Sequence, residues 1–185
     1  LLEVDGVLAW RQGDYPDALT RLSRALEQYK QLEDDLAVSR VLRGLGAVVE
    51  AQGDFRTSRA ILEEALAIAR EDGTPHAIAA SVLSLGLLEA YQGNYAQAEA
   101  LYAECLSLGR EIGDSALLGN VLLNLGLLHE NRGDSDKAWD LMQEGLGAFR
   151  SIDYKIGIGL VLVNLGNFAV DRGHLPDAES FFRQS

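Results

Sequence analysis

The sequence of 185 residues is poor in cysteine, methionine and proline, with one cysteine (Cys105), one methionine (Met142) and three prolines. A single cysteine cannot form an intramolecular disulfide or build a cysteine-based zinc site, and it is compatible with a reducing compartment. No apolar run approaches the ~20 residues that a membrane-spanning helix requires. These absences argue against a disulfide framework and a membrane segment, and we expect a cytoplasmic protein.

Basic side chains are also scarce. Lysine and arginine total 16 against 28 acidic residues, which gives a formal net charge of −12. Nucleic acids and anionic membranes require a basic surface, so we expect neither as a partner of this segment. The chain begins Leu1-Leu2-Glu3 without an initiator, which favours a piece of a longer protein. Glycine, by contrast, is abundant, with 19 residues.

The glycines recur with a period of 40 residues. One series lies in Gly-Asp or Gly-Asn turns or their variants, at Gly13, Gly53, Gly93, Gly133 and Gly173. A second series, preceded by leucine from its second member onward, lies at Gly6, Gly46, Gly86, Gly126 and Gly166. Chance does not produce this phasing without an insertion, so the sequence predicts a repeat array.

Within each repeat, apolar residues follow the spacing of a helix face, which predicts helix A, a turn, helix B and a loop. We expect helix A over 35–52, 75–92, 115–132 and 155–172, and helix B over 15–32, 55–72, 95–112 and 135–152. The first glycine series suits the residue that ends helix A. Asp34, Thr74 and Asp114 are expected to cap the next helix A, and the Asp or Asn after each turn glycine to cap helix B.

The second glycine series lies inside helix A, where each glycine costs ~1 kcal/mol relative to alanine. Close approach of helix B explains this cost. Helix B presents small residues on either side of one large residue, which is Leu22, Leu62, Tyr102, Met142 or Phe182.

Leu-Gly in helix A, a Gly-Asp/Asn-aromatic turn, and the small-large-small pattern of helix B resemble the tetratricopeptide repeat. The 40-residue unit is similar to the repeats of kinesin light chains, spindle-orientation adaptors and bacterial signalling and transcription regulators. It departs from the usual pattern at Leu42, where tryptophan is common. The resemblance implies an all-α, right-handed superhelical solenoid of about 4.5 helix pairs. Its units are approximately 1–33, 34–73, 74–113, 114–153 and 154–185, in one domain spanning 1–185. We expect the uncapped terminal repeats to meet other domains or to associate end to end.

The resemblance also implies that a protein or peptide partner binds along the concave face, which helix A lines. The side chains expected there are Arg40, Arg43, Ser84, Leu87, Tyr91, Asn120, Asn124, Leu127, Asn131, Asn164 and Asn167. In related proteins, asparagines in the slot of Asn124 and Asn164 bind the backbone of an extended peptide. Three alternatives stay open. The asparagines can instead satisfy a neighbouring helix end, the leucines can belong to the core, and the arginines can form surface salt bridges rather than clamp a carboxylate.

The sequence does not predict an enzyme. His76, His129 and His174 share no equivalent slot, so no metal site or cofactor is expected. Cys105 replaces an alanine of helix B, which predicts a buried small residue rather than a nucleophile. The function expected is a protein-interaction scaffold. The alternative is a sensory or autoinhibitory arm of a larger bacterial signalling ATPase or transcription regulator.

Overall fold

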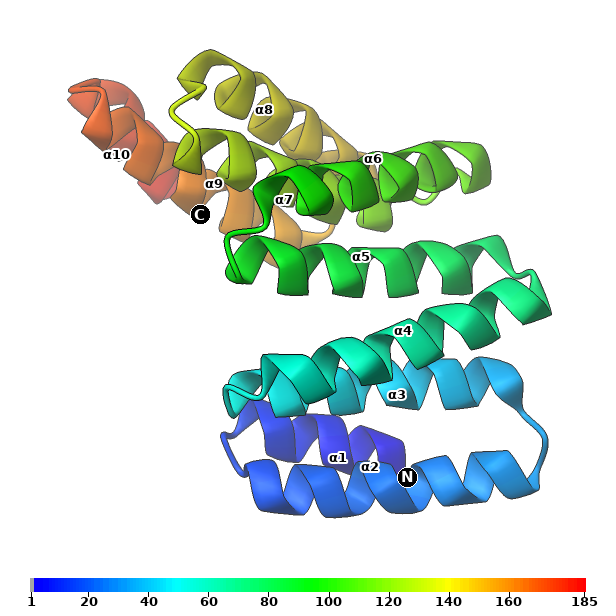
Figure 1. Ribbon diagram of the computed structural model, residues 1–185. Coiled ribbons are helices and arrows are strands. Elements are labelled where there is room, and N and C mark those ends of the chain that lie inside the picture. The colour runs from blue at the N-terminus through cyan, green and yellow to red at the C-terminus, as the bar shows by residue number, and fades with distance from the viewer. Residues whose placement is uncertain (1) are drawn as a thin grey trace. The chain divides into compact units, whose positions relative to one another are not determined.

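The computed structural model describes residues 2–185, which form ten α-helices and no strand (Figure 1). The helices are α1 (Leu2–Arg11), α2 (Tyr15–Gln31), α3 (Asp35–Ala51), α4 (Phe55–Asp72), α5 (Pro75–Tyr91), α6 (Tyr95–Ile112), α7 (Ser115–Asn131), α8 (Ser135–Ser151), α9 (Lys155–Asp171) and α10 (Leu175–Gln184). The all-α class is therefore confirmed. The chain divides into two compact units, Leu1–Leu101 and Tyr102–Ser185, and each is described by itself. Its organisation as one domain of 40-residue repeats stays a prediction.

The helices end within one residue of the predicted positions, because the turns between them require a left-handed backbone. Gly53 follows α3 with a φ of 85°, and Gly13 follows α1 with a φ of 81°. Only glycine adopts this conformation without steric cost. The loop from helix B to the next helix A contains a second left-handed residue. This residue is Gly73 after α4, but Glu33 (φ 54°) and Asp153 (φ 53°) occupy the same slot in other repeats.

The predicted helix caps are confirmed at four positions and wrong at Thr74 and Asp134, whose side chains make no cap hydrogen bond. The Asp34 and Asp114 side chains accept hydrogen bonds from the third residue after each, at 3.0 and 2.9 Å. Asp14 and Asp54 do the same at the starts of α2 and α4. Thr74 does not cap α5, because its hydroxyl donates to the Asp72 carboxylate instead.

In the first unit, α1 packs on α2 and α3 packs on α4 as antiparallel pairs (Figure 1). Helix α3 also contacts α1 and α5, so the three helix A segments lie in sequence order. Gly46 of α3 permits the close approach of α4. A Cβ built at Gly46 would lie 2.6 Å from Leu62 Cδ2, and Leu62 is buried. The predicted role of the second glycine series is confirmed here.

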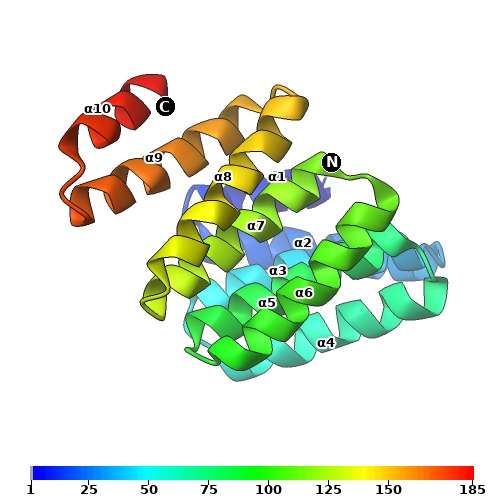
Figure 2. The same cartoon turned by 90° about the horizontal axis from the view of Figure 1, so that it is seen from above.

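In the second unit, α7 packs on α8, α9 contacts both, and α10 packs on α9 (Figure 2). A Cβ at Gly126 would lie 2.7 Å from Met142 Cγ, which repeats the glycine contact of the first unit. Met142 is buried, whereas the large side chain of α10 in the same slot, Phe182, is 42% exposed. Cys105 of α6 is buried, and burial raises the pKa of its thiol to about 12. No helix within residues 2–185 has both the length and the apolar character needed to cross a membrane.

Candidate functional site

The first unit contains a groove of about 430 Å³ between α1, α3, α4 and α5. Its walls comprise Trp10, Arg43, Ala47, Glu50, Ala51, Gly53, Phe55, Leu62, Ser84, Leu87 and Tyr91. Four of the side chains proposed from the sequence, Arg43, Ser84, Leu87 and Tyr91, are therefore brought together. The aromatic residues Trp10 and Phe55 were not proposed, although Phe55 is the aromatic residue of the Gly-Asp-aromatic turn motif.

One wall of the groove is apolar and open to solvent. The Phe55 and Tyr91 rings pack with centroids 5.5 Å apart and an interplanar angle of 43°. Tyr91 is 72% exposed, and Leu87, one helical turn before it on α5, is 40% exposed. Large apolar side chains gathered at a concave surface are a common feature of ligand-binding sites.

Arg40, which was also proposed, is already paired. Its Nε and Nη2 donate to the two carboxylate oxygens of Glu3 at 2.5 and 2.9 Å, and its guanidinium lies 5.9 Å from the centre of the Tyr29 ring. The bond from Arg40 lowers the pKa of Glu3, and the same bond raises the pKa of Arg40. This geometry matches the salt-bridge alternative for Arg40.

Arg43 lies one helical turn further along α3 and has a different environment. It is half-buried, its Nε is enclosed without a hydrogen-bond partner, and it makes no ion pair with any residue among 2–185. Burial is the main cause that lowers its pKa, and the positive charge of Arg40 adds to that effect while Glu3 opposes it. Arg43 is therefore a partly desolvated cation at the wall of the groove.

The repeat spacing explains why Arg43 lacks a partner. Glu3 and Arg40 are separated by 37 residues. Arg43 occupies the slot of Glu3 one repeat later, and the same step of 37 residues from Arg43 leads to Ala80. A methyl group thus stands where an acidic side chain would be needed to neutralise Arg43.

Glu50 is the second uncompensated charge of the groove. It is half-buried, burial raises the pKa of its carboxyl group, and its side chain forms no hydrogen bond or ion pair within the described part of the chain. Glu89 on α5 offers a contrast, because it is 1% exposed yet pairs with Arg59 and accepts a hydrogen bond from Asn94 at 2.8 Å. Buried charge elsewhere in this unit is compensated, whereas Arg43 and Glu50 are not.

The asparagines of the second unit bond to their own helices. Asn120, Asn124 and Asn164 each donate from Nδ2 to the carbonyl oxygen four residues earlier, at 3.0, 2.8 and 2.8 Å. The bond is thus made within one helix, and not to a neighbouring helix end. Each amide retains a second N–H and its oxygen for other partners, so peptide binding by these residues stays a prediction.

The other proposed residues of the second unit differ in exposure. Leu127 is half-buried, and Asn131 and Asn167 are exposed. Leu123, one turn before Leu127, is buried. The leucines of helix A are therefore divided between the core and the surface, with Leu87 of the first unit on the exposed side.

A model of the tetratricopeptide repeat family matches residues 6–71 and 77–151. The chain belongs to this family. The tetratricopeptide assignment agrees with the Leu-Gly pairs that recur every 40 residues and with the helix pairs described above. No curated protein matches the chain in sequence.

Solved structures share the tetratricopeptide fold at low sequence identity. BtubC (BKLC) from P. vanneervenii is 20% identical with a TM-score of 0.79, over 92% of this chain and 71% of that one. The Rap conjugation gene regulator of plasmid pLS20, solved with the Phr* peptide, is 16% identical with a TM-score of 0.86, over 99% of this chain and 51% of its own length. A putative kinesin light chain of Podosopora anserina is 13% identical with a TM-score of 0.70, over 99% of this chain and 90% of that one. These similarities establish a tetratricopeptide-like helical solenoid.

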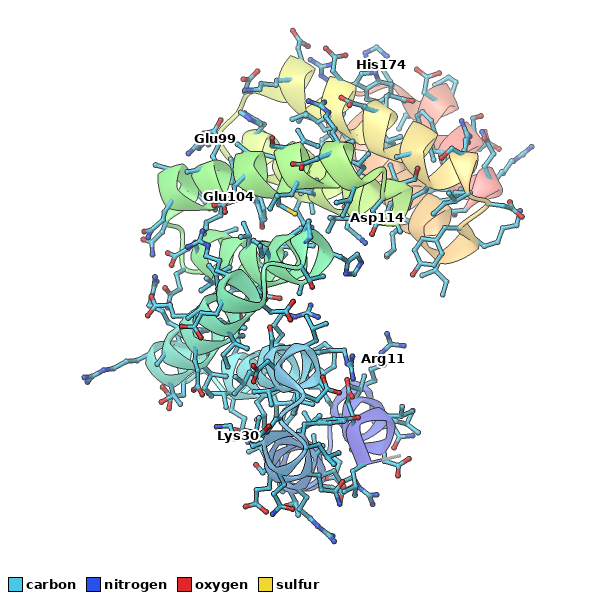
Figure 3. The ribbon with its side chains drawn as sticks, turned by 90° about the vertical axis from the view of Figure 1, so that its right-hand side faces the viewer. Arg11, Lys30, Glu99, Glu104, Asp114 and His174 are labelled. Atoms are coloured by element: carbon cyan, nitrogen blue, oxygen red, sulfur yellow. The ribbon has the colours of Figure 1, made fainter. Side chains whose placement is uncertain are left out.

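The second unit of this tetratricopeptide chain also contains a smaller pocket of about 350 Å³ beside Trp139, where α8 faces the turn between α9 and α10. Two of its acidic residues have partners, because Arg172 pairs with Asp136 at 2.7 Å and His174 lies 3.7 Å from Asp177. Among residues 2–185, no group of three or more His, Cys, Asp or Glu side chains is placed to hold a metal ion. Figure 3 shows the charged side chains distributed along the helices.

Proposed function

We propose that this tetratricopeptide chain is a protein-interaction module that captures a peptide or an unstructured protein segment in the groove of the first unit. The observation that supports this most directly is the combination of exposed Leu87 and Tyr91 with the unpaired, half-buried Arg43 in one concave surface. The groove volume of about 430 Å³ lies in the usual range for ligand sites. The Rap regulator of similar fold was solved with a peptide, which adds support.

The repeat architecture suits this function. Stacked helix pairs hold the helix A surface rigid, so its outward side chains can differ between repeats while the packing residues stay fixed. One such slot contains Arg40, Ala80, Asn120 and Leu160. In the second unit, we propose that Asn124 and Asn164 use their remaining amide groups to bind a peptide backbone.

The test is selection of a random peptide-display library on the purified chain, followed by affinity measurements for the enriched peptides. Leu87→Ser and Tyr91→Ala should each weaken binding by about ten- to a hundredfold, since burying one large apolar side chain contributes about 1.5–3 kcal/mol. Leu32→Ser is the matched control, because Leu32 is 72% exposed and lies outside the groove.

The proposal predicts that the groove variants lose affinity while the control binds normally and all three variants keep the wild-type circular dichroism. Failure to enrich any peptide would contradict it. Equal loss in Leu32→Ser and Leu87→Ser would also contradict it, because binding would then not involve the groove.

A regulatory role is the second proposal, and the similarity to the Rap conjugation gene regulator favours it. The chain spans 51% of the length of that protein, so the comparison concerns one part of a regulator. In this proposal, the peptide-binding stack controls a neighbouring catalytic or DNA-binding domain. Sequencing of the flanking gene should reveal an ATPase or DNA-binding domain, and an open reading frame that encodes helical repeats alone would contradict the proposal.

A further inference from the structure

We propose that the groove of the first unit selects a dipolar segment, in which an acidic group lies opposite Arg43, a basic group lies opposite Glu50, and an apolar side chain lies between them. This inference rests on the peptide-binding function proposed above and specifies the chemistry of the ligand. It follows from the arrangement of two opposite charges that the protein itself leaves uncompensated.

Both charges project from α3 into the same groove. Arg43 and Glu50 are seven residues apart, which is about two helical turns and about 10 Å along the axis. Ala47, midway between them, also lines the groove. Its small side chain leaves room for an apolar group of the ligand, which would contact the aromatic wall of Phe55 and Tyr91.

Because burying a charge without a partner is costly, the groove should prefer a ligand that supplies the missing opposite charges. The other charged side chains of the unit that are buried or half-buried are paired, such as Glu3 with Arg40 and Glu89 with Arg59. Arg43 and Glu50 are half-buried and lack such partners. A ligand that places opposite charges beside them offsets the desolvation that the fold already imposes, and a ligand with the charges reversed is repelled at both ends.

A dipolar ligand also suits the overall charge of the chain better than a purely acidic one. The net charge of −12 repels a segment that contains only acidic residues. A basic residue opposite Glu50 compensates for this repulsion. The required separation of about 10 Å corresponds to three residues of an extended chain or to two turns of a helix.

The repeat spacing provides a variant that neutralises Arg43 without removing it. Ala80 occupies the position, relative to Arg43, that Arg40 occupies relative to Glu3. We expect Ala80→Glu to pair with Arg43 as Glu3 pairs with Arg40. This variant should therefore remove the preference for an acidic group while the guanidinium and the apolar wall remain.

The experiment compares peptides selected from the random display library on the wild-type chain with charge-reversed versions of the same peptides. Reversing the acidic residue of a selected peptide should weaken binding to wild type by about tenfold, and Arg43→Glu should restore it. Reversing the basic residue of the peptide should likewise weaken binding to wild type, and Glu50→Lys should restore it. Ala80→Glu and the milder Arg43→Gln should each lower the affinity of the original peptide. The matched controls, Arg24→Glu and Glu27→Lys, change exposed charges of α2 outside the groove and should leave affinity unchanged.

Two results would separate failure of this inference from failure of the proposed function. Peptides that bind in the groove, as judged by Tyr91→Ala, but show no charge rescue would overturn the dipolar ligand and leave peptide binding intact. Peptides that bind independently of Tyr91, or the absence of any enriched peptide, would overturn both. Equal rescue by Arg24→Glu would also overturn the inference, because the effect would then reflect net charge.

Discussion

Two glycines of α3, Gly44 and Gly46, allow a stringent test of the packing. Both lie in the interior of the same helix, two residues apart. A Cβ at Gly44 would lie 3.6 and 3.7 Å from the two methyl carbons of Leu22, which is ordinary contact. A Cβ at Gly46 would lie 2.6 Å from Leu62 Cδ2 and 2.8 Å from Leu62 Cγ. Gly44→Ala should therefore stabilise the protein, whereas Gly46→Ala should not.

The magnitudes follow from helix propensity and steric overlap. Gly44→Ala should gain the full propensity difference of about 1 kcal/mol, because nothing opposes the new methyl group. Gly46→Ala gains the same amount but must displace Leu62, which is 2% exposed. The overlap involves Cγ, the branch point of that side chain, so rotation of the terminal methyls cannot relieve it. Overpacking of this kind costs about 1–3 kcal/mol, which places Gly46→Ala below Gly44→Ala by that amount.

Thermal and denaturant unfolding, followed by circular dichroism, would measure the difference. For a chain of this size, 1 kcal/mol corresponds to about 2–4 °C in Tm. Leu62→Ala alone should lower stability by about 2–5 kcal/mol, and combining it with Gly46→Ala should cost less than the sum, because the overlap is removed. Equal stabilisation by the two glycine substitutions would refute the proposed close contact between α3 and α4.

Other substitutions and reactivity tests address local features of the chain. Glu33→Gly should increase the free energy of unfolding by about 1 kcal/mol and raise the denaturant midpoint, because Glu33 has the left-handed φ of 54° that glycine adopts at Gly73 in the next repeat. A lower midpoint would contradict this. Arg40 lowers the pKa of Glu3, so their pairing stabilises the fold at pH values above the ordinary glutamate pKa of 4.5. This stabilisation is lost as the pH falls below 4.5 and through the lowered pKa of Glu3. The stability difference between wild type and Glu3→Gln, less than about 1 kcal/mol for this partly exposed pair, should therefore disappear in acid. Cys105, with a pKa of about 12, should react with iodoacetamide only after unfolding, and rapid labelling of the folded chain would contradict its burial.

The helices and turns could be predicted because each depends on local sequence. Gly53 ends α3 for a steric reason that involves its own backbone, and Asp54 begins α4 through a bond to Thr57, three residues away. The prediction that Thr74 caps α5 was wrong, and the reason is equally local. Asp72 competes for its hydroxyl, so the side chain turns away from the helix that it was expected to cap.

The compensation of buried charge could not be predicted in the same way. Glu89 looks like an ordinary member of helix A, in a slot that contains Val49, His129 and Ala169 in other repeats. It is buried because Arg59 of α4 reaches it from the preceding repeat. At a repeat position whose residue type varies, the exposure of the side chain therefore cannot be predicted until its partner across the helix interface is known.

The repeat spacing nevertheless explains why Arg40 has an acidic partner and Arg43 does not. Both arginines lie on the same helix, and the sequence alone predicts the same role for both. Once one inter-repeat pair is known, Glu3 with Arg40, its step of 37 residues can be applied along the chain. From Arg43 the step leads to Ala80, which cannot neutralise a cation. In a repeat protein, a charge whose expected partner slot contains a small apolar residue is therefore a candidate for ligand binding, and on this criterion we propose Arg43 as a binding residue and Arg40 as a structural one.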